Sequence, residues 1–160
     1  MSILITAASH AEAYKLERLL QLPDVTFGDF KELPPFTSGR KFIKLPRGNS
    51  ASYAHEVLDL ALNSGIERIF PLYQEEILPL AESRQLFGEY GISVIVPSLL
   101  WLRKPVNLSL NYSSELLVLE NGKVLSGKLS EGILLPEENF SGIFLIESDN
   151  ANPAFKLFTV

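Results

Sequence analysis

Short apolar runs alternate with stretches of helical periodicity throughout residues 1–98, and this alternation limits the possible folds most strongly. The apolar runs predict strands, and the stretches between them repeat apolar side chains every three or four positions, as amphipathic helices do. Such alternation is typical of parallel strands joined by right-handed crossovers. We therefore expect an α/β fold, with a small Rossmann-like parallel sheet and helices on both faces. The expected strands cover residues 3–7, 25–28, 41–45, 68–72 and 92–96, and the expected helices run from Ser9 to Leu22, from Ser50 to Ser64 and from Gln74 to Tyr90.

Short motifs predict where several of these elements begin and end. Ser9 and Glu12 have the spacing of a capping box, so Ser9 is expected to cap the first helix. Gly65 is expected to close the second helix, because glycine readily adopts the left-handed conformation found there. Residues 33–39 are rich in turn formers and predict a loop. Asn121-Gly122 between two alternating runs predicts a type I′ hairpin.

The sequence changes character after Pro97-Ser98. Residues 99–102 predict one more helical turn, and short alternating runs follow. We therefore expect an α/β domain at residues 1–98 and a β-rich extension at residues 99–160 packed on it. The strands expected in the extension cover residues 108–112, 116–120, 123–129, 142–147 and 155–159.

Composition argues against several classes of protein and of site. The formal net charge is −5 and no basic stripe is present, so neither nucleic acid nor an anionic membrane is an expected partner. The absence of cysteine excludes disulfides, thiolate metal sites and cysteine nucleophiles. Residues 1–5 have no basic segment before their apolar run, so they predict a strand and not a signal peptide. Together these features favour a cytoplasmic location.

Residues 65–98 resemble a known domain family. They begin with GIERIFPLYQEEILPLA at residues 65–81 and continue through Phe87, Gly91-Ile92, Val94 and Pro97-Ser98. This run resembles the pre-ATP-grasp domain, which opens carbamoyl-phosphate-synthase-like and related carboxylate–amine ligases. In that family a Gly-Ile-Asp strand ending in Pro precedes an acidic, Leu-rich helix and then a Gly-Ile strand ending in Pro-Ser. Residues 3–20 and 46–61 are similar to the two earlier units, so the resemblance covers residues 1–98 and implies the same fold.

The chain departs from this family after Ser98. In the family, Pro-Ser leads through a short helix to an Asp-Lys pair that begins the ATP-binding region, whereas here WLRKP follows at residues 101–105 without an aspartate. No glycine-rich phosphate loop follows, and no paired carboxylates and asparagine for magnesium. The 62 residues beyond residue 98 are too few for two nucleotide-clamping lobes. We therefore expect no cofactor, and do not transfer the family's ligase activity to this chain.

A ligand of an open α/β sheet binds outside the carboxyl ends of the strands. Three loops qualify here, and they give the candidate ligand-binding residues Ser9, His10, Tyr73, Gln74, Glu75 and Ser98. The first loop also offers free N–H groups at a helix start, which favour an anion. No pattern of catalytic residues or metal ligands is present, so neither a catalytic nor a metal site is predicted.

Each candidate also has an explanation without a ligand. Ser9 can serve simply as a helix cap, and Glu75 and Glu76 can complement the dipole at a helix start. His55 lies in mid-helix beside Glu56, which favours a surface position.

Three functions agree with these observations. The first is a noncatalytic, pre-ATP-grasp-like module for small-ligand binding or subunit assembly. The second is the substrate-binding component of a split ATP-grasp ligase, whose separately encoded partner subunit would supply ATP and magnesium. The third is a purely structural homodimer, formed through the C-terminal β region that ends in the apolar strand at residues 155–160.

Overall fold

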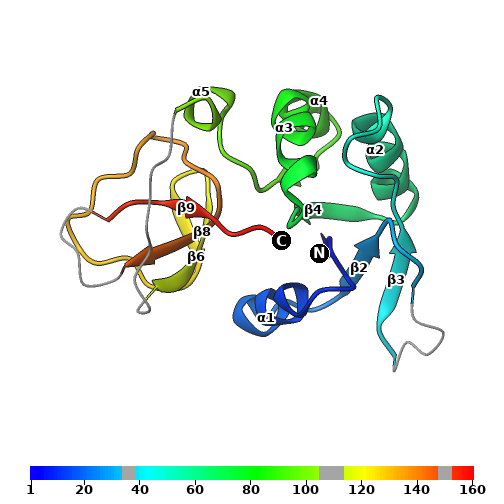
Figure 1. The fold of residues 1–160 in the computed structure, drawn as a ribbon, viewed down its shortest axis with the longest axis horizontal. Coiled ribbons are helices and arrows are strands. Elements are labelled where there is room, and N and C mark those ends of the chain that lie inside the picture. Colours follow the sequence, from blue (N-terminus) through cyan, green and yellow to red (C-terminus); the bar gives the residue numbers. More distant parts are fainter. Residues whose placement is uncertain (34–38, 105–113, 148–152) are drawn as a thin grey trace. The chain divides into compact units, whose positions relative to one another are not determined.

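The computed structural model describes residues 1–33, 39–104, 114–147 and 153–160 of the chain. These residues divide into two compact units (Figure 1). The first unit comprises residues 1–94 together with residues 159–160, and the second comprises residues 95–158.

The described residues of the first unit form a five-stranded, entirely parallel sheet in the order β3-β2-β1-β4-β5. The chain moves outward from β1 to β3 and then returns to β4 on the other side of β1. This order, with its reversal between β1 and β4, is that of a Rossmann-like sheet. The strands are β1 Ser2–Ile5, β2 Val25–Asp29, β3 Lys41–Lys44, β4 Ile66–Phe70 and β5 Ser93–Val94.

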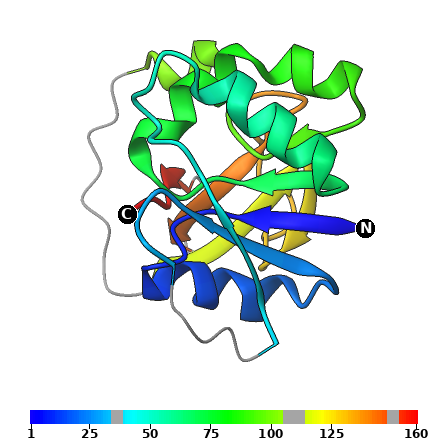
Figure 2. The ribbon, with the colours of Figure 1, turned by 90° about the vertical axis from the view of Figure 1, so that its right-hand side faces the viewer.

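Helices cover both faces of this sheet, which confirms the expected α/β fold. In Figures 1 and 2, α1 lies on one face, whereas α2, α3 and α4 lie on the other. The central strand β1 is therefore apolar without alternation, and its Ile3, Leu4 and Ile5 are all fully buried. The helices are α1 Ala11–Leu20, α2 Tyr53–Asn63, α3 Gln74–Glu82 and α4 Arg84–Glu89.

Some element boundaries differ from the sequence-based prediction. The expected cap at Ser9 is wrong, because His10 is the N-cap residue of α1 and its side chain makes no capping bond. The expected helix from Gln74 to Tyr90 is interrupted at Ser83, whose φ of −98° and ψ of 5° end α3 before α4 begins. The fourth strand begins earlier than predicted and ends at Phe70, because Pro71 has no N–H to donate to a neighbouring strand.

The second unit contains a four-stranded antiparallel sheet in the order β7-β6-β8-β9. A cluster that includes Trp101, Phe140, Phe144 and Phe155 forms its core. The strands are β6 Ser114–Glu120, β7 Lys123–Ser126, β8 Gly142–Glu147 and β9 Lys156–Leu157, and a short helix, α5 Leu99–Leu102, precedes them. The β-rich C-terminal region is therefore confirmed. The strand predicted at residues 108–112, and most of the loop predicted at residues 33–39, lie outside the described residues.

Local predictions in glycine-containing turns are confirmed. Gly65 has a φ of +64° after α2. Asn121 and Gly122 have φ values of +49° and +77°, which a type I′ turn requires at its two central positions. The apolar strand predicted at residues 155–159 is represented by β9, which pairs with β8 of the same chain. Every helix in the described part of the chain is too short or too polar to cross a membrane.

Candidate functional site

Four loops of the first unit meet at the carboxyl edge of the parallel sheet. Because β1, β2, β3 and β4 all run in the same direction, the residues that follow them are brought to one edge. The residues that meet there are 9–10 after β1, 30–31 after β2, 47–48 after β3 and 73–76 after β4.

Asp29 connects three of these loops. It is the last residue of β2 and only 1% of its surface is exposed. One carboxylate oxygen accepts a hydrogen bond from Ser9 N at 2.8 Å, and the other accepts from Lys31 N at 2.9 Å and from Tyr73 Oη at 3.0 Å. Burial by itself would raise the pKa of Asp29, but these donors outweigh burial and hold the pKa below its usual value. Asp29 is therefore a fixed anion that organises the loops.

Tyr73 is the N-cap residue of α3 and lies almost completely buried beside Asp29. The single hydrogen of its hydroxyl is donated to Asp29. The Ser9 hydroxyl lies 3.2 Å from Tyr73 Oη and must therefore be the donor in that hydrogen bond. Burial, reinforced by the charge of Asp29, raises the pKa of Tyr73 to about 12. Tyr73 is thus a neutral hydrogen-bonding group at ordinary pH, and it provides no base to activate Ser9.

Cationic and aromatic side chains surround this polar centre. The rings of Phe30 and Tyr73 lie 5.0 Å apart. Lys31 Nζ lies 5.8 Å from the centroid of each ring, and the Arg47 guanidinium carbon lies 5.0 Å from that of Phe30. Lys31 Nζ is also 3.2 Å from His10 Nε2, and the His10 ring meets the Tyr73 ring edge-on at 5.4 Å. The edge of the sheet therefore combines flat apolar surfaces with positive charge.

An open cavity of about 460 Å³ adjoins the rings of Phe30 and Tyr73. Lys31 and Arg47 lie against the Phe30 ring but are not among the residues that line the cavity. Two hydrogen bonds hold Thr159 and Val160 at the rim of the cavity. Val160 N donates to Leu72 O at 2.8 Å, and Thr159 Oγ1 donates to Gln74 Oε1 at 2.9 Å. Its lining combines aromatic, aliphatic and polar groups, as small-molecule sites commonly do. The lining residues are Phe30, Tyr73, Gln74, Glu75 and Val160.

A second polar group, Glu76, lies fully buried in the first turn of α3. Its carboxylate accepts a hydrogen bond from Thr6 Oγ1 at 2.6 Å and from Tyr73 N at 3.4 Å, and Thr6 in turn accepts from Leu72 N at 2.8 Å. Burial raises the pKa of Glu76 to about 7, although its hydrogen-bond donors act in the opposite direction. The hydroxyl of Tyr53 is also buried beside Glu76, and burial together with the charge of Glu76 raises the pKa of Tyr53. Among the described residues it makes no hydrogen bond of regular geometry.

Gly48 holds the loop after β3 against the start of α3. A side-chain carbon at this position would lie 2.8 Å from Glu75 Cγ and 2.9 Å from the backbone nitrogen of Glu76. Only glycine permits this approach without a shift of the backbone. The β3–α2 loop, which carries Arg47, is therefore positioned by backbone packing on the helix that contributes Gln74 and Glu75.

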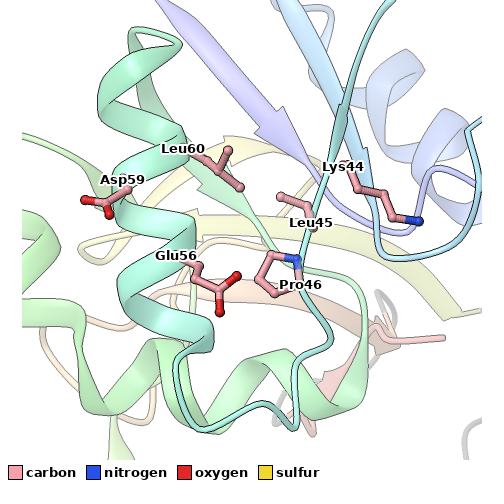
Figure 3. Close-up of a pocket in the computed structure, with 6 residues that line it drawn as sticks. All are labelled: Lys44, Leu45, Pro46, Glu56, Asp59 and Leu60. Atoms are coloured by element: carbon pink, nitrogen blue, oxygen red, sulfur yellow. The ribbon is translucent and has the colours of Figure 1, made fainter.

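A different cavity, of about 420 Å³, lies between the end of β3 and α2 (Figure 3). Leu45, Pro46 and Leu60 form its apolar part, whereas the charged ends of Lys44 and Asp59 point away from one another and from that part. Glu56 is held by the Ser52 hydroxyl. Because its polar groups do not converge, this cavity is a weaker candidate than the one at the carboxyl edge of the sheet.

The structure brings five of the six predicted ligand-binding residues to the same edge of the first unit. Ser9 and His10 contact Tyr73, while Gln74 and Glu75 follow it and line the cavity. The sixth, Ser98, belongs to the second unit, where its hydroxyl accepts from Trp101 N at 3.1 Å and donates to Glu137 Oε1 at 2.5 Å. Ligand binding by these residues stays a prediction. His55 is exposed on α2, in agreement with the sequence analysis.

Sequence analysis missed Asp29, Phe30, Lys31 and Arg47. The signal that could have found Asp29 is its place directly after an apolar strand, since the rule about carboxyl ends applies to every parallel strand and not only to the three loops selected. Phe30 and Lys31 follow it in the same loop.

Comparisons with known proteins do not extend these observations. No protein-family model matches the chain, and no curated protein matches it either. Within the described residues, no group of three or more histidine, aspartate or glutamate side chains has an arrangement that could hold a metal ion.

Proposed function

We propose that this chain is a noncatalytic, pre-ATP-grasp-like module that binds a small ligand at the carboxyl edge of its parallel sheet. The observation that carries the proposal is the cavity of about 460 Å³ beside the Asp29–Tyr73–Ser9 hydrogen bonds. Its volume falls within the range of roughly 300–1,000 Å³ that small-molecule sites occupy. It also adjoins the reversal of strand order between β1 and β4, where ligands of such sheets bind.

The hydrogen-bonded side chains beside the cavity support binding more than catalysis. Tyr73 holds its proton at ordinary pH, and the carboxylate of Asp29 is fully used by fixed donors. Ser9 donates its hydroxyl hydrogen to Tyr73, which is not a base. A reaction would need a nucleophile or an acid–base group with a matched partner, and Tyr73, Asp29 and Ser9 do not form such a pair. Glu76, whose pKa is raised to about 7, is fully buried and is not among the residues that line the cavity.

A blocked-cavity variant tests the proposal. Gln74→Trp places a large ring at the rim, and Gln85→Trp places the same ring on an exposed position of α4 that does not line the cavity. A small-molecule library is screened by two-dimensional NMR of the full chain. We expect hits to shift the backbone amides of Ser9, Phe30 and Gln74, and to lose affinity in Gln74→Trp but not in Gln85→Trp. A library with no hit at these amides would contradict the proposal.

A further inference from the structure

We infer that the ligand of this site is a small anion carried on a flat aromatic ring, with its anionic group near Lys31 and Arg47 and its ring against Phe30 and Tyr73. This inference rests on the proposed function, because it specifies the chemistry of the ligand that the cavity binds. Four features of the site carry it.

The first feature is positive charge without a carboxylate partner. Unlike Arg40, which pairs with Glu17, and Lys41, which pairs with Asp24, neither Lys31 nor Arg47 forms an ion pair within the described residues. Both nevertheless lie against the ring of Phe30, at 5.8 Å and 5.0 Å. The same edge also holds the buried carboxylate of Asp29 and the exposed carboxylate of Glu75, so the positive charge is local to the Phe30 ring, where Lys31 and Arg47 lie.

The second feature is the capacity of these cations to form new hydrogen bonds. An ammonium group has three donors, and Lys31 directs one of them to His10 Nε2. Arg47 is exposed, and its guanidinium faces the Phe30 ring. A guanidinium has five donors and suits carboxylate or phosphate groups in particular. Donors of both residues therefore remain available to an anionic group.

The third feature is the pair of aromatic rings. Phe30 and Tyr73 both line the cavity and are inclined to one another at 49°. The hydrogen bond from the Tyr73 hydroxyl to Asp29 fixes the orientation of the Tyr73 ring in the absence of a ligand. A flat ring gains about 0.5–1.5 kcal/mol beyond simple burial when it meets an aromatic side chain in offset or edge-on geometry.

The fourth feature is Glu75, which gives the cavity a direction. Its side chain is exposed and lines the cavity from the α3 side. A ligand anion next to this carboxylate would be repelled, so Glu75 disfavours an anionic group on its own side of the cavity. Replacing Glu75 with glutamine should consequently strengthen the binding of an anion.

Five probes separate the charge of the ligand from its ring. Benzoate and phenyl phosphate have both features, benzamide has the ring alone, and acetate and inorganic phosphate have the charge alone. Binding constants are obtained from NMR titrations of the full chain at low ionic strength, with the amides of Phe30 and Gln74 as reporters. The variants are Lys31→Gln, Arg47→Gln and Glu75→Gln, with Lys128→Gln, an exposed lysine of the second unit, as the control for net charge.

We expect benzoate or phenyl phosphate to bind at least about fivefold more tightly than benzamide and than the ring-free anions, as partly exposed charge pairs allow. Lys31→Gln and Arg47→Gln should each weaken these two probes about fivefold, Glu75→Gln should strengthen them, and Lys128→Gln should have no effect. A preference for benzoate over phenyl phosphate, or the reverse, identifies the anionic group.

Equal binding of benzamide and benzoate, or binding that none of the three site variants changes, would overturn the inference. Benzamide shifts at the same amides would then leave the proposed function standing. Failure of all five probes also overturns the inference, and the library screen then decides the proposed function separately.

Discussion

The hydroxyl of Tyr73 donates to both carboxylate oxygens of Asp29, at 3.0 and 3.2 Å, and thereby joins the ends of two strands that are not neighbours in the sheet. Asp29 ends β2 and Tyr73 follows β4, while β1 lies between these strands. The hydrogen bond therefore crosses the carboxyl end of β1. Ser9 N, in the loop that follows β1, donates a further hydrogen bond to the Asp29 carboxylate. This bridge fixes three loops around the candidate cavity.

Loss of the Tyr73 hydroxyl should destabilise the first unit. Tyr73→Phe keeps the ring but removes the donor to Asp29, and a hydrogen bond to a charged, buried group contributes about 1.5–3 kcal/mol. We expect the free energy of unfolding, measured by urea titration at pH 7, to fall by about 2 kcal/mol. Tyr90→Phe is the matched control, because the Tyr90 side chain is 57% exposed. Equal effects of the two substitutions would show that the bridge does not stabilise the fold.

Asp29 should make the protein sensitive to acid. Its hydrogen-bond donors hold its folded-state pKa below the usual value of 3.8, so the unfolded chain takes up the proton first as the pH falls. The stability that Asp29 contributes is therefore complete above the unfolded pKa and is lost below it. We expect Asp29→Asn to be strongly destabilised at pH 7 and to differ less from the unmodified protein at pH 3, in urea unfolding at both pH values. If the difference in unfolding free energy between Asp29→Asn and the unmodified protein were the same at pH 7 and pH 3, protonation of Asp29 would not control the stability.

The contribution of Glu76 to stability should depend on pH in the opposite direction to that of Asp29, and in a higher pH range. Its pKa is raised from 4.5 to about 7 in the folded state, so the folded protein binds the proton more tightly than the unfolded chain. Stability therefore falls as the pH rises from about 4.5 to about 7, by on the order of 3 kcal/mol for a shift of this size. Glu76→Gln keeps an acceptor for Thr6 and Tyr73 N but carries no charge.

We consequently expect Glu76→Gln to be more stable than the unmodified protein at pH 8 and to lose this advantage near pH 5. Thermal unfolding at both pH values measures the difference. Glu89→Gln, at an exposed position of α4, is the control and should leave the pH dependence unchanged. If Glu76→Gln were less stable at pH 8, the carboxylate would be needed in its charged form, and its burial would not dominate.

The central strand β1 could be predicted from the sequence because burial on both faces leaves an uninterrupted apolar run at residues 3–5. The role of Ser9 could not be predicted in the same way. Local spacing favoured a helix cap, but Asp29, twenty positions away, binds the Ser9 N–H and the helix begins after His10. A contact between distant residues overrode a local preference.

The same limit applies to most of the candidate site. The rule that ligands bind at the carboxyl ends of strands could select the loops that contain Ser9 and Tyr73. The pairing of Tyr73 with Asp29 depends on the register of β1 with β2 and with β4, which the apolar pattern does not specify. The role of Gly48 could not be predicted either, because its contact with α3 depends on how the β3–α2 loop folds back onto that helix.

The contact of Gly48 with α3 leads to a prediction with a built-in control. In Gly48→Ala the new methyl group would meet the backbone of Glu75 and Glu76 at 2.9 Å, so the loop or the start of α3 must move. We expect a loss of about 1–3 kcal/mol in the free energy of unfolding, as for other overpacked sites. Gly88, within α4, has open space around it, so Gly88→Ala should instead stabilise the protein by about 0.5–1 kcal/mol through its better helix propensity. Opposite signs for the same chemical change, measured by urea unfolding, would show that close backbone contact requires glycine at position 48, whereas two changes of the same sign would refute it.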